Sequence, residues 1–337
     1  MTSGPVLLGV DGGNTKTVAV VAGADGTILG GARILRTSDI YAVAPDLAVA
    51  IHHEVADAAL ASAGLSPDRV SVSAAFSLAG ADWPEDIALL ERSLRPRWPG
   101  AIVVNDAIGA LRAAVPEGPG VVVVCGTGAA TGARGPDGRT WHTSFWQEPQ
   151  GGHELGVRAL RAIYRADLGI DQPTLLTERI LAATGESSVE SLLHHASGRE
   201  VADRRDPAAL AWIVLEAADA GDAAAVEIVS RLGVELGRTA LAAARRVGIE
   251  PADRFGLGLA GGVLRHPGNR LRDAIVRTVL DGAPHAELLG RPPEPAAGAL
   301  LLASDAAGLT VDGAFLDRIR LGLASVDLFD THPARTT

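Results

Sequence analysis

Short apolar runs bounded by turn residues fill the first third of the chain, and alanine-rich stretches with helical spacing lie between the later runs. Short runs of this kind predict strands, whereas apolar residues at helical spacing over ten or more positions predict helices. The predicted strands are Val6–Val10, Thr17–Ala22, Thr27–Leu35, Val70–Phe76 and Ile102–Val104, and the predicted helices are Asp46–Ala63 and Pro84–Leu94. The element order is therefore βββαβαβ.

A similar order begins again further along the chain. Strands are predicted over Val121–Cys125 and Ala129–Arg134, and a third follows the turn at residues 136–138. A largely helical stretch runs from about Glu154 to Arg246, with breaks near Gly169–Pro173, Gly185 and Gly198–Pro207; it is followed by a strand over Arg254–Leu259 and helices at about Asn269–Leu280 and Pro295–Ala307. The pattern predicts an α/β protein whose two halves each open with a strand meander.

Composition and charge exclude several classes of function. A chain of 337 residues is long enough for two domains with separate cores. Its net charge of -10 argues against a nucleic-acid or anionic-membrane surface, and no apolar stretch is long enough to span a bilayer. The single cysteine, Cys125, excludes an internal disulfide and a cysteine-based metal site. With no secretion signal at the N-terminus, we expect a cytoplasmic protein.

Three glycine-containing turns each follow a predicted apolar strand: Asp11–Thr15, Gly126–Gly128 and Gly258–Gly262. Ligands of open α/β sheets bind beyond the carboxyl ends of strands, where backbone N–H groups and hydroxyls in such turns can bind phosphate oxygens. The first turn also contains Lys16, the only lysine of the chain. The three turns together indicate a nucleotide, although the first alone could be an ordinary β-hairpin turn.

Familiar nucleotide motifs fit poorly. A P-loop requires glycine before its lysine, but Thr15 precedes Lys16. Residues Gly256–Gly261 match the dinucleotide fingerprint Gly-x-Gly-x-x-Gly, a weak signal this late in the chain that we keep as an alternative. The signatures of protein kinases, serine hydrolases and zinc proteases are absent.

Asp106 is the strongest candidate for chemistry because it follows a strand and precedes the helix that starts at Ala107. In phosphoryl transfer to a hydroxyl, a carboxylate accepts the hydroxyl proton. The same position also suits an aspartate that caps the helix. Both interpretations stay open at this point.

The ordered set Gly9–Lys16, Asn105–Ala107, Val124–Gly128 and Leu259–Val263 resembles the BadF/BadG/BcrA/BcrD ATPase family, and most closely its N-acetylglucosamine kinases, within the actin/hexokinase/Hsp70 superfamily. The resemblance covers roughly residues 5–309. It implies an α/β fold of two actin-like (ribonuclease H-like) domains, residues 1–107 and 108–337, with a nucleotide cleft between them and a helical insertion in the second.

The resemblance also implies roles for the nucleotide side. The first phosphate loop would comprise Gly12, Gly13, Asn14, Thr15 and Lys16, the second Gly126, Thr127 and Gly128, and the border of adenosine Gly261 and Gly262. The expected cofactors are ATP and Mg²⁺, with Asp11 and Asp106 near the metal, directly or through water. Asp106 would also be the base that deprotonates the sugar.

On the sugar side this chain departs from the family pattern. Ser38 and Asp39 stand where the family has Ser-Asn or Thr-Asn, so Asp39 would accept sugar hydroxyl protons or else be a plain loop aspartate. Counting back from Gly156 puts Glu148 at the position of a sugar-binding aspartate. His153 and Glu154 are rival candidates, although His153 could simply be a polar residue at a helix start.

The expected function is an ATP-dependent phosphotransferase acting on an amino sugar, N-acetylglucosamine or glucosamine. The only partner expected is the small-molecule sugar, with no nucleic acid or membrane, and a homodimer is compatible with the resemblance. A non-catalytic module that senses ATP or sugar is the alternative. An ATPase activator would need a cluster-binding cysteine pair, whereas this chain has Cys125 alone.

Overall fold

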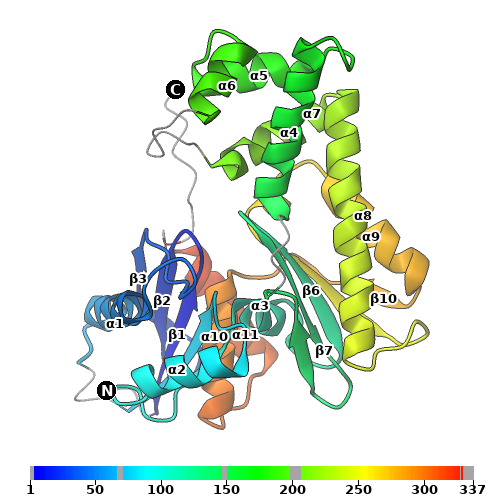
Figure 1. The fold of residues 1–337 in the computed structure, drawn as a ribbon. Helices are drawn as coiled ribbons and strands as arrows, with labels where there is room; N and C mark the ends of the chain where they lie inside the picture. Colours follow the sequence, from blue (N-terminus) through cyan, green and yellow to red (C-terminus); the bar gives the residue numbers. More distant parts are fainter. Residues whose placement is uncertain (1–3, 67–70, 146–149, 198–205, 327, 329–337) are drawn as a thin grey trace.

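The computed structural model describes residues 4–66, 71–145, 150–197, 206–326 and 328. Two five-stranded sheets form two lobes (Figure 1). The first sheet has the order β3-β2-β1-β4-β5, and the second the order β10-β9-β6-β7-β8. The strands are β1 (Val6–Gly12), β2 (Thr17–Ala22), β3 (Ile28–Ile34), β4 (Val72–Leu78), β5 (Ile102–Asn105), β6 (Gly120–Cys125), β7 (Ala129–Arg134), β8 (Thr140–His142), β9 (Phe255–Ala260) and β10 (Ala286–Leu288).

The two sheets share one topology. In each, the first strand pairs antiparallel with the next strand of its meander and parallel with a strand from later in the chain: β1 lies between β2 and β4, and β6 lies between β7 and β9. The predicted α/β class and the repeated meander are therefore confirmed. The short strand β10 was not predicted.

The helices are α1 (Pro45–Ser62), α2 (Pro84–Leu94), α3 (Asp106–Ala114), α4 (Gly151–Asp167), α5 (Leu175–Thr184), α6 (Val189–Ser197), α7 (Ala211–Asp219), α8 (Ala223–Arg246), α9 (Arg270–Gly282), α10 (Pro295–Ala306) and α11 (Gly313–Ala324), with short 3₁₀ turns at Pro207–Leu210 and Val263–Arg265. Helices α4 to α7 rise above the second sheet (Figure 1). The predicted break at Gly185 is a left-handed C-cap, whereas most of the break predicted at Gly198–Pro207 lies outside the described residues. Helix α11 was not predicted.

The first sheet is covered on both faces. Leu8 and Val10 pack in a cluster with residues of α1 and α2, whereas Leu7 packs with residues of α10 and α11. Helix α10 lies directly on β1, since a Cβ added to Gly9 would stand 2.6 Å from the backbone nitrogen of Leu300. The last two helices of the chain therefore complete the core of the first lobe. The division at residue 107 stays a prediction.

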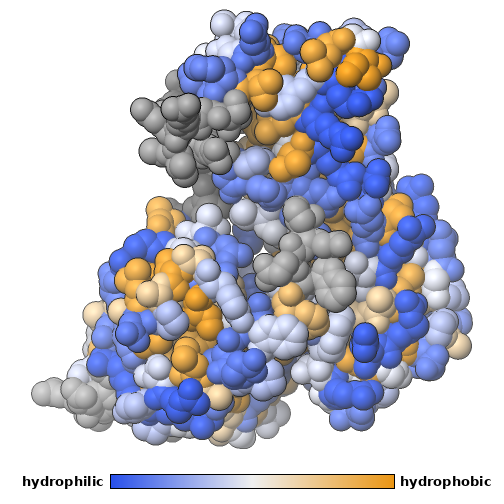
Figure 2. Space-filling model, in the orientation of Figure 1, coloured by the Kyte–Doolittle hydropathy of each residue, from blue (hydrophilic) through white to orange (hydrophobic). Residues whose placement is uncertain are grey.

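Helix α3 connects the lobes by its packing. It contacts β6 and β7 of the second sheet and also α10, where a Cβ added to Gly298 would stand 1.8 Å from the carbonyl oxygen of Gly109. Among the described residues no helix is both long and apolar enough to cross a bilayer. Hydrophilic side chains are spread over all parts of the face in Figure 2.

Candidate active site

The carboxyl ends of the parallel strands face a cleft between the two lobes. Strands β1, β4 and β5 are parallel neighbours, so residues that follow them meet at one edge of the first sheet. Val124 lies beside Ala260 at the matching edge of the second sheet. The cleft has a volume of about 560 Å³, and eight predicted site residues line it: Asn14, Thr15, Asp39, Asp106, Gly126, Thr127, Gly128 and His153.

The first glycine turn connects β1 to β2, so it is a hairpin turn that also lines the cleft. The N–H of Gly13 donates a 3.0 Å hydrogen bond to the carbonyl of Lys16 and closes the turn. Asn14 and Thr15 lie exposed at its tip. The hairpin and phosphate-loop interpretations are therefore compatible.

Gly12 and Ser38 support this turn from behind. A Cβ added to Gly12 would stand 2.6 Å from Ser38 Oγ and 2.8 Å from Leu78 Cδ2, so a larger residue would have to displace these side chains. Ser38 is 1% exposed, and its Oγ lies 2.9 Å from Thr17 Oγ1. Ser38 thus lies behind the turn and outside the lining of the cleft, where it supports the backbone of the loop.

Lys16 also lies away from the cleft lining. Burial lowers the pKa of its ammonium group, an effect that the negative charges of Glu294 and Asp11 oppose. Glu294, the residue before α10, forms an ion pair with Arg265 from the second lobe. Lys16 therefore belongs to a charged group that involves both lobes.

The second glycine turn is held by the start of α4. The N–H groups of Gly152 and His153 donate 2.8 Å hydrogen bonds to the carbonyls of Gly126 and Thr127. Gly151 has φ of 72°, and a Cβ there would stand 2.3 Å from the carbonyl oxygen of Gly128. The turn and the helix are thus packed backbone against backbone, which requires glycine at position 151.

The third turn packs on the strand that carries the second. Gly261 has φ of 101°, and an added Cβ would stand 2.3 Å from the carbonyl oxygen of Cys125. The dinucleotide alternative is wrong, because Gly256 and Gly258 lie inside β9 and not in a turn. Gly258 instead allows close packing against Ala114, whose Cβ would be 2.5 Å from an added Cβ.

Asp106 is the first residue of α3, but it does not cap the helix. Asn105 is the N-cap, and its Oδ1 accepts a 2.9 Å hydrogen bond from the Ala107 N–H. Burial raises the pKa of Asp106 to about 6, although the Ala107 N–H opposes the shift. The capping interpretation of Asp106 is therefore wrong, and its carboxylate is available to the cleft.

Two further aspartates stand near Asp106. Burial raises the pKa of Asp11 to about 7, and the charge of Asp106 adds to the shift. Asp39 lines the cleft, its Oδ1 accepts a 2.8 Å hydrogen bond from the Tyr41 N–H, and burial raises its pKa as well. Within the described residues, no group of three or more His, Cys, Asp or Glu side chains is placed to hold a metal ion by itself.

Sequence reasoning missed Asp82, which also lines the cleft. Its Oδ1 accepts a 2.8 Å hydrogen bond from Asn105 Nδ2, and burial together with the charges of Asp106 and Asp39 raises its pKa to about 7. The available signal was its position, four residues beyond the end of β4 at Leu78 and so at the same sheet edge as Asp106.

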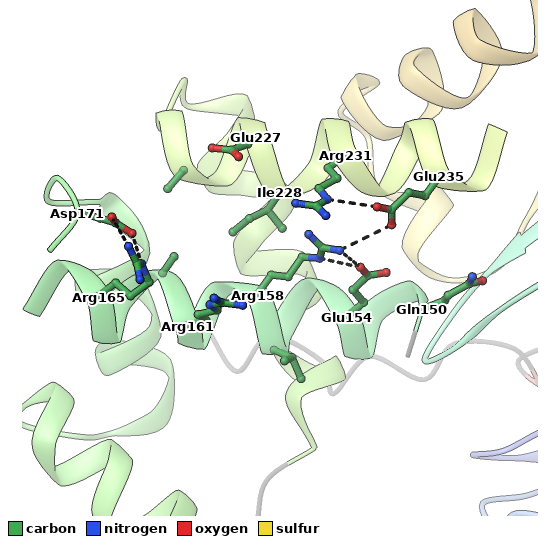
Figure 3. Close-up of a pocket in the computed structure, with 13 residues that line it drawn as sticks. Gln150, Glu154, Arg158, Arg161, Arg165, Asp171, Glu227, Ile228, Arg231 and Glu235 are labelled. Atoms are coloured by element: carbon green, nitrogen blue, oxygen red, sulfur yellow. Dashed lines mark hydrogen bonds and ion pairs between the residues drawn. The ribbon is translucent and has the colours of Figure 1, made fainter. Parts of the chain in front are cut away.

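The site residues predicted around the start of α4 do not all line the cleft. His153 lines the cleft, with Nδ1 3.3 Å from Asp206 Oδ1. Glu154 is 7% exposed and faces a separate groove of about 790 Å³ between α4 and α8, where it forms an ion pair with Arg158 (Figure 3). Neighbouring helix residues point about 100° apart, and His153 and Glu154 accordingly line different pockets. Glu148 lies outside the described residues.

Two sheets of equal topology around a cleft with glycine turns are the architecture of the two-domain, actin-like ATPases. The chain belongs to the BadF/BadG/BcrA/BcrD ATPase family, whose sequence profile matches residues 8–303.

Two curated relatives span nearly the same length. An N-acetyl-D-glucosamine kinase of Dictyostelium discoideum is 26% identical over 313 residues, which cover 88% of this chain and 97% of the relative. An N-acetylmuramic acid/N-acetylglucosamine kinase of Clostridium acetobutylicum is 25% identical, with 88% and 97% covered.

Solved structures show the same fold. A Chromobacterium violaceum protein provisionally named an N-acetylglucosamine kinase superposes with a TM-score of 0.64 at 24% identity, covering 89% of this chain and 99% of that one. A ROK family glucokinase of Streptomyces griseus superposes with a TM-score of 0.52 at 21% identity, covering 89% and 98%.

Proposed function

We propose that this protein is an ATP-dependent kinase that transfers the γ-phosphoryl group to a hydroxyl of an amino sugar. The observation that carries the proposal is the position of Asp106. Its carboxylate lines a cleft that is also lined by two glycine turns, and Asn105 caps α3 in its place. Membership of an ATPase family and two curated relatives named as amino-sugar kinases support it.

ATP would lie across the two turns. Gly12, Gly13, Asn14, Thr15 and Lys16 would form the first phosphate loop, in which Thr15 contacts the β- and γ-phosphates. Residues 126–128 would bind phosphate from the other lobe, and Gly261 and Gly262 would border adenosine. Two loops from opposite lobes can hold one triphosphate only when the lobes close, which also excludes water from the transfer.

The carboxylates of Asp11 and Asp106 fit Mg²⁺. They are close enough for the charge of one to raise the pKa of the other, and proteins commonly hold Mg²⁺ through one or two carboxylates together with phosphates. When bound with ATP, the ion would supply positive charge that neutralises the charge developing on the phosphates. Asp11 would be its nearer protein ligand, directly or through water.

Asp106 would act as the base. Its carboxylate accepts the proton of the sugar hydroxyl while that oxygen forms a bond to the γ-phosphorus, and the bond from this phosphorus to the β,γ-bridging oxygen breaks, so ADP leaves with the electron pair. With a pKa of about 6, the carboxylate is ionised at neutral pH and still basic enough to accept a proton.

Asp39 and Asp82 would accept hydrogen bonds from other sugar groups, because both line the cleft beside Asp106. Ser38 would act indirectly by supporting the first turn. Glu148 and His153 stay candidate sugar ligands, and Glu154 would contribute only if the acceptor reached the groove between α4 and α8. A homodimer also remains an expectation.

The test is acceptor-dependent release of ADP by the full chain, measured for wild type, Asp106→Asn and the control Asp281→Asn on the exposed end of α9. We expect Asp106→Asn to lower turnover by about 10² to 10⁴ while ATP affinity changes little. Asp281→Asn should match wild type. Near-full turnover in Asp106→Asn would contradict the base assignment, and ATP and sugar binding without turnover in wild type would favour the sensing module.

A further inference from the structure

The charged side chains in the proposed acceptor part of the cleft are mainly carboxylates. Three of its lining residues are carboxylates, Asp39, Asp82 and Asp106. Among the described lining residues none is Arg or Lys, and the one histidine, His153, stands next to Asp206. Along the described part of the lining, a neutral acceptor would therefore meet carboxylates with no Arg or Lys beside them.

Two of these carboxylates are held in place by fixed donors. The Tyr41 N–H holds Oδ1 of Asp39, and Asn105 Nδ2 holds Oδ1 of Asp82. Gly80, with φ of 81°, lets the chain pass so close that an added Cβ would stand 2.4 Å from Asp39 Oδ1. Each aspartate thus keeps one oxygen occupied by the protein and has a second oxygen to offer a ligand.

MgATP does not remove this charge. The complex has a net charge of about -2 near neutral pH, and its ion would lie against Asp11 and Asp106 at the phosphates. Asp39 and Asp82 come from different loops, after β3 and after β4. Burial raises the pKa of both carboxylates, and an acceptor that carries an ammonium group would favour their ionised forms.

We propose that Asp39 and Asp82 select the acceptor by charge, so that a sugar with a free, protonated amino group is preferred over its N-acetylated form and a sugar bearing a carboxylate is excluded. This inference rests on the proposed kinase function. An ammonium group supplies three donors and a positive charge to partly desolvated carboxylates, and charge-assisted hydrogen bonds are about twice as strong as neutral ones. A carboxylate brought beside two others lacks a donor and is repelled.

The experiment compares kcat/KM for glucosamine, N-acetylglucosamine and N-acetylmuramic acid at pH 7, by ADP release from the full chain. We expect glucosamine to exceed N-acetylglucosamine by about tenfold or more, and N-acetylmuramic acid to give almost no turnover. Raising the salt concentration should increase KM for glucosamine and leave KM for N-acetylglucosamine nearly unchanged, because salt screens charge.

The variants Asp82→Asn and Asp39→Asn test the residues, with Asp281→Asn as the control. Asparagine keeps the oxygen that accepts from Asn105 or Tyr41 and removes only the charge. We expect each variant to reduce the preference for glucosamine by about tenfold, through KM for the sugar and not for ATP. A variant that fails to fold would be recognised by its loss of ATP binding. In that case the other aspartate variant tests the proposal.

The outcomes separate the two proposals. If none of the sugars stimulates ADP release, the kinase function itself fails. If N-acetylglucosamine is used as well as glucosamine by wild type, or if the aspartate variants weaken both sugars equally, the kinase function stands and selection by charge is overturned.

Discussion

The two sides of the cleft differ in whether backbone or side-chain groups form them. The proposed nucleotide side is supported by backbone packing: Gly151 and Gly261 have positive φ, and a Cβ added to either would stand 2.3 Å from a carbonyl oxygen of a neighbouring strand or turn. The acceptor side is made of side chains, Asp39, Asp82 and Asp106, which reach the cleft from three separate loops and helix starts. Backbone contact tolerates no added Cβ, whereas a carboxylate can be exchanged for an amide with little change of shape.

This contrast gives the two sides different vulnerabilities. A substitution on the nucleotide side should disturb geometry and thereby ATP affinity. A substitution on the acceptor side should leave the fold intact and change which sugar reacts, because specificity depends on pairing of polar groups with the substrate.

The largest effect is expected at Gly261. Gly261→Ala forces a Cβ to within 2.3 Å of the Cys125 carbonyl at a φ of 101°, so the third and second turns must move apart. We expect kcat/KM for ATP to fall by up to about 100-fold, since misplacement by about 1 Å can cost that much. The matched control is Gly313→Ala at the exposed start of α11, away from the cleft, because nothing described lies within 4 Å of its added Cβ. Equal activity of both variants would show that the turn does not position ATP.

The second prediction concerns pH and the acceptor side. Asp106 works as a base only when ionised, so kcat/KM for the sugar should fall as pH falls through about 6, by about tenfold for each further pH unit. The profile is measured from pH 5 to pH 8, with circular dichroism to confirm folding. A flat profile over this range would contradict the role of Asp106.

The third prediction is a gain in stability on the nucleotide side. The pKa of Asp11 is raised to about 7 in the folded state, so the folded protein binds more protons than the unfolded chain, and stability falls as pH rises from about 4 to about 7. Asp11→Asn removes the free-energy cost of ionising a buried carboxyl group. We therefore expect about 1–3 kcal/mol of extra stability at pH 8 without nucleotide or metal. Thermal unfolding at pH 8 and pH 5 checks it. A gain that is as large at pH 5 would show that charge is not the cause.

The smallest effect is expected from Glu154→Gln. Glu154 faces the groove between α4 and α8 with Arg158, not the cleft (Figure 3). We therefore expect KM for the sugar to change by less than about twofold, against about tenfold for Asp39→Asn. If Glu154→Gln raised KM for the sugar as strongly as Asp39→Asn, the acceptor would extend into the groove.

Local pattern was enough to predict most of the fold and two of the turns that line the cleft. Strand ends followed by glycine turns were visible as short apolar runs before Asp11–Thr15 and Gly126–Gly128, and these turns do line the cleft. The pattern could not place Ser38 or Glu154, because a polar residue near a site looks the same in sequence whether it faces the ligand or supports the loop. It also missed α11, whose packing on the first sheet is a contact between distant parts of the chain.

The amino-acid sequence by itself determined most of the element order, the repeated meander and the three glycine turns, because hydrophobic periodicity and the conformational needs of glycine are local properties. Only the tertiary structure decided which aspartates share the cleft. Asp82 lies beside Asp39 and Asp106 because β4 pairs in parallel with β1 and β5. Asn105, and not Asp106, is the N-cap of α3, and Asp106 lines the cleft. Those choices depend on strand register and on competition for hydrogen bonds, which no local pattern records.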